Sequence, residues 1–581
     1  MLALLAVLVG ILHAARVSWV TDDAFISFRY AENLAGGHGL VYNAGERVEG
    51  YSNFLWTLWC AAGIALGVAP VRWSVLWGVI CYAATLALLA RFAASRGAAR
   101  ATAAGAAASF ATAPGAAANG RAAAAALPLA AMLGAVDRDW AIFAASGLET
   151  ALFTLLALAG YLLVLDSPGR PRRAAAAGLA LALAALTRPD GVLFSFIAGA
   201  YLLAVSPRRA RDLAAFALPL ALVLAPYAAW KLAYYGDLLP NTYYAKSADR
   251  AWYSQGIMYS GLFFRKYWVL PLGALLCAAA ALTRRWPAAA APGTGGGGAA
   301  RWNRAAALAA AFALVYTLYV TRVGGDFMYA RLLIPVTPFG LILAELAFER
   351  LVPARVAPRA AIATALAAGV ALTPYPFRGQ GWVHGIVNEW EFYAPRERER
   401  ARDFGLRLRE YFRGLPMRVA FCGGQAGLAY YSRAPLAIET ATGLTDSTIA
   451  HQPLAGRGRV GHEKKTPIPY LIARGTHVWM YSSKLLADSL APYIPIVPVQ
   501  LDTLTVMAIT WDPPVMDALR ARGARMPDFL ATLDRFLAVM PSLPDAQVRE
   551  VYEKTRRFYF DHVRDPRREA PFRARLGLPP P

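Results

Sequence analysis

The sequence has few cysteines and little charge for its length. Its four cysteines lie far apart among 581 residues, and three of them fall in apolar segments, so neither a disulfide framework nor a cysteine metal cluster is predicted. The chain also lacks the P-loop lysine motif and the paired Cys/His spacing of a zinc site. Only 17% of its residues are charged. A soluble chain of this length would carry more charge and would divide into several domains, each with its own core.

What the sequence has instead is a series of apolar segments that recur until about residue 373 and raise the hydrophobic content to 57%. We predict a polytopic α-helical membrane protein of about eleven spans, since each span needs about 20 apolar residues. The predicted spans lie near residues 1–20, 72–92, 119–136, 147–166, 174–188, 191–206, 212–232, 264–283, 303–321, 330–349 and 359–374. The first could be a cleaved signal peptide, but it lacks a basic start and further spans follow, so we expect a retained helix.

The net charge of +22 would suit a nucleic-acid partner if the basic residues formed one patch. They lie instead largely in the short connectors between apolar segments and in the C-terminal third. Basic connectors mark the cytoplasmic side of a membrane protein, so no nucleic acid is expected. The same rule lays segment 54–69 along the outer surface as an interfacial helix, because a further span there would invert every later basic connector. All unusual polar motifs then fall on the outer face, in loops 21–71, 137–146, 188–190, 233–263 and 322–329 and after about residue 375.

From about residue 379 the composition changes to charged, mixed α/β sequence. Strands are predicted at 417–421, 436–440, 477–481 and 495–501, and helices at 395–412, 515–540 and 545–558. Two domains follow from this change: a membrane domain of residues 1–375, with a first outer loop at 21–71, and a soluble outer α/β domain of residues 376–581.

Several motifs follow one another along the chain: DDAFISFRYAENLAGGHGLVYNAGERVEGYSNFLWTL from residue 22, ASGLETALF (145–153), LTRPDG (186–191), YYGDLLPNTYYAK (234–246), GGDFMYARLLIPVTP (324–338), GLTD (443–446) and HEKK (462–465). Over about residues 1–480 the chain resembles the polyprenyl-phosphate-sugar-dependent membrane glycosyltransferases of the GT-C superfamily, in particular the terminal β-arabinofuranosyltransferases of mycobacterial cell-wall arabinan. The resemblance implies a GT-C fold in a bacterial plasma membrane. It also implies a polyprenyl-phosphate sugar donor and a glycan or lipid-linked acceptor.

Asp22 and Asp23 are the candidate catalytic bases. Paired charge at the mouth of a membrane helix is costly and marks function by default. A neighbouring like charge and partial burial would raise the pKa of one carboxyl toward the range of a general base. The alternative is that one of the two only caps the next helix. The resemblance implies that an acid of the first loop is the base, and the sequence leaves open which.

Transfer from a lipid phosphate also needs cations for the leaving group. The candidates are Arg29, Arg188, Lys246 and Arg331. Arginine offers a fork matched to phosphate oxygens. Arg188 could instead pair only with Asp190 in its TRPDG turn, and Arg331 could reach the interface from a helix end without any ligand.

The predicted substrate contacts are Glu46, Asp190, Asn241, Tyr243 and Asp326. For Glu46 a solvated loop salt bridge is an equal alternative, and Tyr243 could serve as an interfacial anchor. Glu149 follows Ser146 at the spacing of a capping box, which by itself explains its position. No metal site is predicted and no cofactor is required, although the first-loop acids could hold a divalent cation.

The sequence thus predicts an outer-face glycosyltransferase, with direct displacement and inversion at the sugar. One rival is a transporter or flippase of lipid-linked sugars, but the polar motifs gather on one face and no duplicated half with interrupted helices is visible. The other is a structural envelope protein that binds glycan without turnover.

Overall fold

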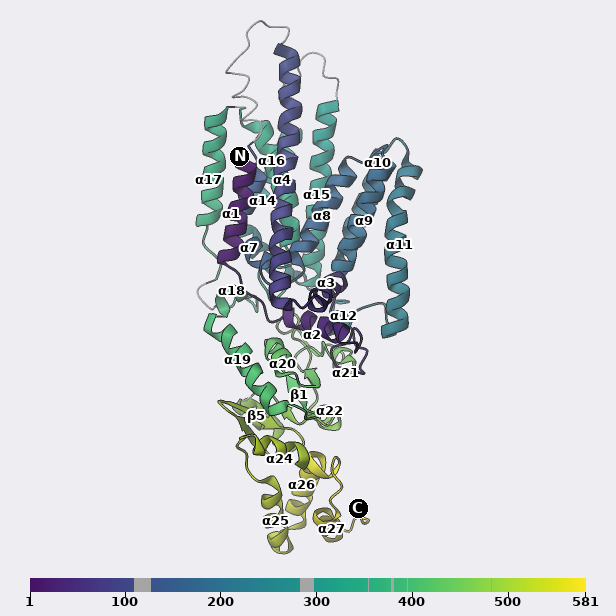
Figure 1. Cartoon of the computed structure of the whole chain (residues 1–581), viewed down its shortest axis with the longest axis vertical. Helices are drawn as coiled ribbons and strands as arrows, with labels where there is room; N and C mark the ends of the chain where they lie inside the picture. Colours follow the sequence, from purple (N-terminus) through teal and green to yellow (C-terminus); the bar gives the residue numbers. More distant parts are fainter. Residues whose placement is uncertain (109–126, 283–296, 354, 378–380, 394, 482) are drawn as a thin grey trace. The chain divides into compact units, whose positions relative to one another are not determined.

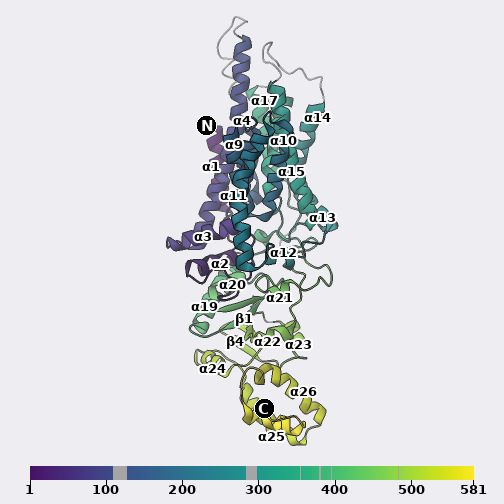
Figure 2. The same ribbon diagram turned by 90° about the vertical axis from the view of Figure 1, so that its right-hand side faces the viewer.

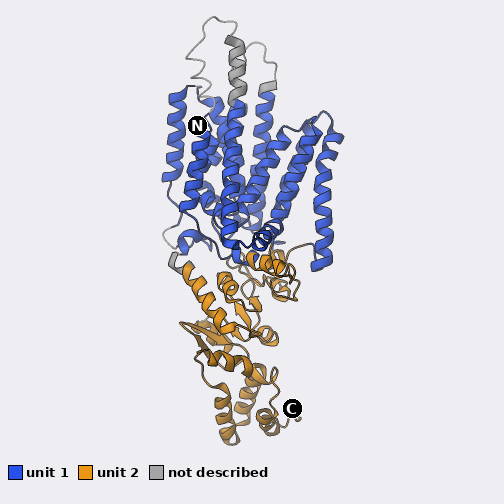
Figure 3. Ribbon diagram, in the orientation of Figure 1, with its two compact units in different colours: residues 1–27, 52–238, 248–393 blue, residues 28–51, 239–247, 394–581 orange. Residues whose placement is uncertain are grey.

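The computed structural model describes residues 1–108, 127–282, 297–353, 355–377, 381–393, 395–481 and 483–581 (Figure 1). The chain forms two compact units (Figure 3). Unit 1 comprises Met1–Ser27, Ser52–Leu238 and Ala248–Tyr393. Unit 2 comprises Phe28–Tyr51, Leu239–Ser247 and Ala394–Pro581, so it combines the C-terminal residues with parts of two predicted outer loops.

Unit 1 is a helical bundle whose long helices run side by side (Figures 1 and 2). The helices are α1 (Leu2–Arg16), α3 (Phe54–Ala65), α4 (Pro70–Ala108), α6 (Leu129–Val136), α7 (Arg138–Ala144), α8 (Thr150–Leu165), α9 (Pro171–Thr187), α10 (Val192–Val205), α11 (Arg209–Tyr235), α13 (Tyr253–Lys266), α14 (Val269–Leu282), α15 (Gly297–Val323), α16 (Thr337–Leu351), α17 (Val356–Leu372) and α18 (Glu389–Phe392). The described part of each predicted span contains an α-helix, although residues 330–336 of the span 330–349 form a turn and a short 3-10 helix before α16. The start of predicted span 119–136 lies outside the described residues.

Length and composition support fewer crossings than were predicted. Among the described residues, three helices are long and apolar enough to cross a membrane: Pro70–Arg96 within α4, α11, and Ala299–Val323 within α15. A fourth arises if α13 and α14 form one broken span. The remaining spans stay predictions.

One predicted span differs in shape from the structure. Segment 264–283 was expected to be a single helix, but the chain bends by 85° between α13 and α14. Tyr267 leaves helical geometry at φ −102° and ψ 48°, and its hydroxyl donates to Asp139 Oδ2 at 2.6 Å. This long-range contact fixes the bend.

Unit 2 holds a five-stranded mixed sheet in the order β2-β1-β3-β5-β4. Its strands are β1 (Arg418–Phe421), β2 (Leu436–Glu439), β3 (Val478–Trp479), β4 (Pro498–Leu501) and β5 (Leu504–Ala508). β1 runs parallel to both β2 and β3, with Val419 opposite Ala437 and Val478, while β5 pairs antiparallel with β3 and β4. The four predicted strands are confirmed, and β5 was missed.

The helices of unit 2 complete an α/β arrangement around this sheet. They include α12 (Asn241–Ala245), α19 (Pro395–Phe412), α20 (Ala426–Ser432), α21 (Ser447–Ala450), α22 (Ile468–Ala473), α23 (Lys484–Leu490), α24 (Pro513–Ala521), α25 (Phe529–Val539), α26 (Asp545–Thr555) and α27 (Pro566–Arg575). Helix α2 (Ala24–Ala35) begins at the end of the first segment of unit 1 and continues into unit 2.

Candidate active site

The two first-loop acids lie in a turn directly before α2. The carbonyls of Thr21, Asp22 and Asp23 accept hydrogen bonds from the backbone N–H groups of the first three residues of the helix. The backbone N–H of Thr21 donates to Ser146 O at 3.0 Å, which joins this turn to the segment before α8. Both acids keep partly exposed side chains. They are therefore held at a helix N-terminus and are still accessible to solvent.

Arg331 brings three separate segments of unit 1 together. Its Nη1 lies 3.2 Å from Asp23 Oδ2 and 3.5 Å from Asp326 Oδ2, and its Nη2 lies 3.8 Å from Glu149 Oε1. The preceding residue, Ala330, has φ +67°, an uncommon left-handed conformation for a residue with a side chain. This turn aims the guanidinium at the acids, so Arg331 is an internal ion-pair partner and does not only reach from a helix end.

Arg188 lies in the same network. It holds Asp190 with two parallel hydrogen bonds, Nε to Oδ1 at 3.1 Å and Nη2 to Oδ2 at 2.8 Å, and the Tyr316 hydroxyl donates to Asp190 Oδ2 at 2.6 Å. Arg188 Nη1 also lies 3.4 Å from Glu149 Oε1. The alternative that Arg188 pairs only with Asp190 therefore does not hold, because Arg188 contacts both Asp190 and Glu149.

Glu149 connects the two arginines and was not predicted as a site residue. The capping-box interpretation is wrong, because within the described chain its side chain makes no cap hydrogen bond at α8. Oε1 faces Arg188 and Arg331, and Oε2 accepts from Asn53 Nδ2 at 3.0 Å. Asn53 Oδ1 in turn accepts from Ser27 Oγ at 3.1 Å. Only 3% of the Glu149 side chain is exposed, a burial that a carboxylate tolerates when cations surround it.

Carboxylates outnumber cations in this network. Arg188 and Arg331 are the two cations, and the acids joined to them are Asp23, Glu149, Asp190 and Asp326. An acidic group of this kind can accept a proton from a hydroxyl group. It can hold a phosphate only if some acids are protonated or additional cations come close.

Glu389 is a further acid near this group. It begins α18, outside the membrane-spanning helices, and its Oε2 accepts a hydrogen bond from Thr21 Oγ1 at 2.9 Å. Burial, followed by the nearby charges of Asp23, Asp22 and Asp326, raises the pKa of Glu389 to about 8. At neutral pH it is mostly an uncharged acid beside the catalytic candidates. The sequence signal for it was an acid within the apolar and aromatic stretch IVNEWEFY.

Two predicted residues, Arg29 and Glu46, belong to unit 2 and have structural partners there. Buried Arg29 donates from Nε to Tyr42 O and from Nη2 to Ala434 O, both at 2.8 Å. Glu46 forms an ion pair with Arg474. The salt-bridge alternative for Glu46 thus holds, but with a residue far along the chain.

The motif YYGDLLPNTYYAK contributes the other three predicted residues, which also lie in unit 2. Asn241 Nδ2 donates to the carbonyls of Gly443 (2.8 Å) and Leu444 (2.9 Å), so two of the sequence motifs meet here. Tyr243 packs edge-on against Tyr244 within α12, and Lys246 follows that helix with an exposed side chain. The roles of these residues stay predictions.

A second pair of buried acids, Asp137 and Asp139, has a D-x-D spacing that sequence reasoning did not single out. Asp137 caps α7 by accepting from Trp140 N, and Asp139 accepts from Tyr267. Burial raises their pKa values to about 6 and about 7. Their contacts explain them structurally. Within the described residues, no group of three or more His, Cys, Asp or Glu side chains is arranged to hold a metal ion.

Comparison with known proteins places this arrangement in a wider context. No protein-family model matches the chain. The chain is 34% identical over 346 residues to the terminal β-(1→2)-arabinofuranosyltransferase of Corynebacterium glutamicum. This alignment covers 54% of this chain and 46% of that protein. It is 31% identical over 337 residues to the protein of the same name from Mycobacterium tuberculosis, 54% of this chain and 50% of that protein. The chain thus spans about half the length of the curated relatives it matches.

The fold has its counterpart among solved structures. The crystal structure of ArnT from Cupriavidus metallidurans bound to undecaprenyl phosphate aligns with a TM-score of 0.52 and 15% identity, over 88% of this chain and 97% of ArnT. The apo structure of the same protein aligns with the same score and 16% identity. The predicted resemblance to the arabinofuranosyltransferases is therefore confirmed, and the chain has a helical fold similar to that of ArnT.

Proposed function

We propose that the protein is an integral-membrane glycosyltransferase. It transfers a monosaccharide from a polyprenyl-phosphate donor to a glycan or lipid-linked acceptor at the outer face of a bacterial plasma membrane. The observation that carries the proposal is the buried network of Asp23, Arg331, Glu149 and Arg188, formed by four separate segments of a GT-C fold. The names of the relatives favour arabinofuranose as the sugar, and the structure of ArnT with undecaprenyl phosphate bound supports a polyprenyl-phosphate donor.

In the proposed reaction, Asp22 or Asp23 takes the proton from an acceptor hydroxyl. The acceptor oxygen then forms a bond to the anomeric carbon, while the bond between that carbon and the phosphate oxygen breaks and the phosphate keeps the electron pair. Attack opposite the leaving group inverts the configuration. Both acids lie in a turn with partly exposed side chains, where a hydroxyl can reach them.

Arg331 is the phosphate contact that the geometry favours. It already contacts Asp23, and 13% of its side chain is exposed. Asp190 occupies the Nε and Nη2 edge of Arg188 with two hydrogen bonds, and Nη1 faces Glu149. The contribution of Arg188 is therefore to hold Glu149 and through it Arg331. Asp190 and Asp326 of unit 1 are the sugar contacts we propose beside this network. Lys246 and Arg29, predicted for the phosphate, and Glu46, Asn241 and Tyr243, predicted for the sugars, belong to unit 2, and their roles stay predictions.

The test is a transfer assay with purified protein in lipid nanodiscs. Wild type, Asp22→Asn and Asp23→Asn are given a panel of radiolabelled polyprenyl-phosphate monosaccharides and membrane glycan as acceptor. Asp249→Asn is the matched control, because that acid is in unit 1, is 61% exposed and pairs only loosely with Arg250 at 3.9 Å. We expect turnover with one donor, loss of turnover in one of the two first-loop variants, and a rate near wild type in the control.

The transporter hypothesis makes the opposite prediction in the same preparation. The broken helix pair α13 and α14 is the feature that would favour it, since transporters build sites at interrupted helices. Absence of turnover with every donor, together with passage of lipid-linked sugar across proteoliposome membranes, would replace the enzyme proposal by transport.

A further inference from the structure

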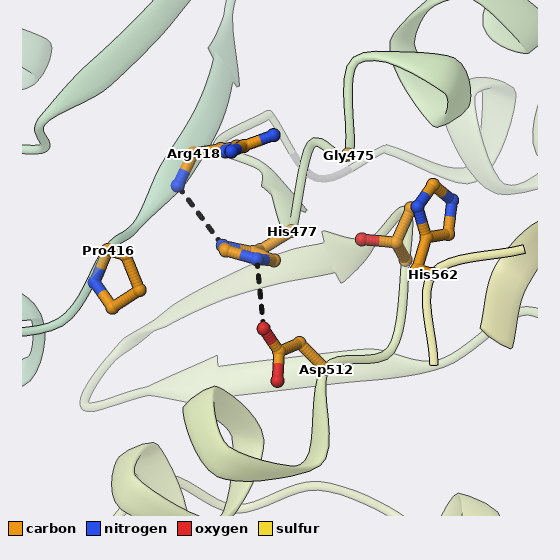
Figure 4. A pocket seen from close by; sticks show the side chains of 7 residues that line it. Pro416, Arg418, Gly475, His477, Asp512 and His562 are labelled. Carbon is orange, nitrogen blue, oxygen red and sulfur yellow. Dashed lines mark hydrogen bonds and ion pairs between the residues drawn. The ribbon is translucent and has the colours of Figure 1, made fainter. Parts of the chain in front are cut away.

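Unit 2 contains a cavity that no part of the proposed reaction uses (Figure 4). Its volume is about 220 Å³. It lies where β1 and β3 begin and where the chain leaves β5. The lining residues that matter here are Arg418, Gly475, His477, Thr510, Asp512 and His562.

His477 is the buried polar group of this cavity. Its Nδ1 accepts a hydrogen bond from the backbone N–H of Arg418 at 3.1 Å. In the neutral ring the proton must therefore sit on Nε2. This nitrogen is 3.7 Å from Asp512 Oδ2, too far for a direct hydrogen bond (Figure 4). The Nε2–H donor of His477 and the carboxylate of Asp512 thus line the same space, and neither satisfies the hydrogen-bonding capacity of the other.

Gly475 keeps the other side of the cavity open. It has φ +62°, and a Cβ at this position would lie 3.0 Å from Arg418 Nη1 and 4.0 Å from His562 Nδ1. Arg418 Nη1 is fixed by donating to Arg474 O at 3.0 Å. Any side chain at position 475 would therefore enter the space between the guanidinium group and the His562 ring.

The charges of the lining side chains cancel. Burial lowers the pKa of His477 to about 4 and also lowers that of His562, so both rings are neutral at neutral pH. Arg418 and Asp512 then leave a net charge of zero. An anion would meet the Asp512 carboxylate and a cation would meet the Arg418 guanidinium, while the described residues provide no metal-binding group.

A neutral ligand with several hydroxyl groups fits this combination of donors and acceptors. Each hydroxyl can donate to Asp512 and accept from His477 Nε2–H or Arg418. The cavity is smaller than the roughly 300–1,000 Å³ of pockets for drug-sized ligands, so it suits a single ring. We propose that this cavity binds one sugar residue of the acceptor glycan. The assignment to the acceptor rests on the proposed function, whereas binding of a sugar does not.

The first experiment measures binding without turnover. Full-length protein in nanodiscs is titrated with methyl glycosides of pentofuranoses and hexopyranoses, and binding is followed by saturation-transfer NMR. Asp512→Asn should weaken binding about tenfold or more, because it removes a charged hydrogen-bond acceptor. Gly475→Ala should also weaken binding, because its methyl group would enter the cavity beside Arg418 Nη1. Asp517→Asn, an exposed acid of α24 paired with Arg520, is the matched control.

The second experiment links the cavity to transfer. In the transferase assay, Asp512→Asn should raise the acceptor KM and leave kcat and the donor KM unchanged, while Asp22→Asn should retain sugar binding. Two results would overturn the inference even in an active enzyme. One is that wild type binds no glycoside at millimolar concentration, and the other is that Asp512→Asn and Gly475→Ala bind glycosides as tightly as wild type does. Glycoside binding that both variants weaken, in a protein without transferase activity, would support the sugar site and refute the proposed function.

Discussion

The replacement Glu389→Gln tests the electrostatics of the candidate site most directly. The pKa of Glu389 is about 8 in the folded protein, against an ordinary value of 4.5. Between these two pH values the folded state binds more protons than the unfolded state, so wild-type stability must fall as pH rises through this window and level off above it. Each pKa unit corresponds to 1.36 kcal/mol, so the full effect is about 5 kcal/mol.

Glutamine has nearly the shape of the protonated acid and can accept the same hydrogen bond from Thr21, but it does not titrate. We therefore expect Glu389→Gln to match wild type near pH 5 and to become the more stable protein by about 4 kcal/mol near pH 9. Thermal unfolding in nanodiscs, followed by tryptophan fluorescence across this pH range, measures the difference. A gap in Tm that stays constant, or one that narrows as pH rises, would refute the reasoning.

Two further variants separate this effect from general destabilisation. Glu391→Gln removes a carboxylate two residues away that already pairs with Arg138 at 3.1 Å, and we expect no gain in stability at high pH. Thr21→Val removes the hydrogen bond that favours the charged form of Glu389. It should therefore make the loss of stability with rising pH larger than in wild type.

Three other substitutions test the ion-pair network. Glu149→Gln removes the negative charge shared by Arg188 and Arg331, so it should cost about 3 kcal/mol or more of stability, measured by thermal unfolding. It should also lower the transfer rate at least about a hundredfold, measured by radiolabelled transfer. Arg188→Lys keeps the positive charge but loses the double hydrogen bond to Asp190, so we expect a similar loss of transfer rate. Its transfer rate should be little higher than that of Arg188→Met, which lacks the charge as well. Tyr316→Phe leaves Asp190 one donor short and should lower stability by about 1–3 kcal/mol, with transfer reduced less than by Arg188→Lys.

The helical body could be predicted because the chemistry of a bilayer leaves few choices. Backbone groups in lipid must bond within their own segment, so long apolar segments become helices. The bend at Tyr267 could not be predicted in this way. It depends on a hydroxyl that reaches Asp139, 128 positions away in the chain, and local composition around residues 264–283 carries no trace of that partner.

The candidate site was predicted where a catalytic or substrate-binding role stood beside the local explanation of a residue. Asp23, Arg188, Asp190, Asp326 and Arg331 all lie in short polar stretches between apolar segments, and the structure joins them. Residues with a sufficient local explanation were missed. Glu149 matched a helix cap, and only the tertiary structure shows that its carboxylate faces two arginines instead.

The excess of carboxylates has a consequence for the proposed reaction. A donor phosphate that approaches Arg331 also approaches Asp23, Asp326 and Glu149, so its binding is opposed unless negative charge is removed. Below its pKa of about 8, Glu389 is uncharged and adds no further negative charge to this group. Donor binding should therefore be coupled to proton uptake at Glu389 at and above about pH 8, where this acid is ionised in the free protein, whereas acceptor activation at Asp22 or Asp23 requires an ionised carboxylate. The two requirements fall on different acids of one cluster, which allows both to be met at the same pH.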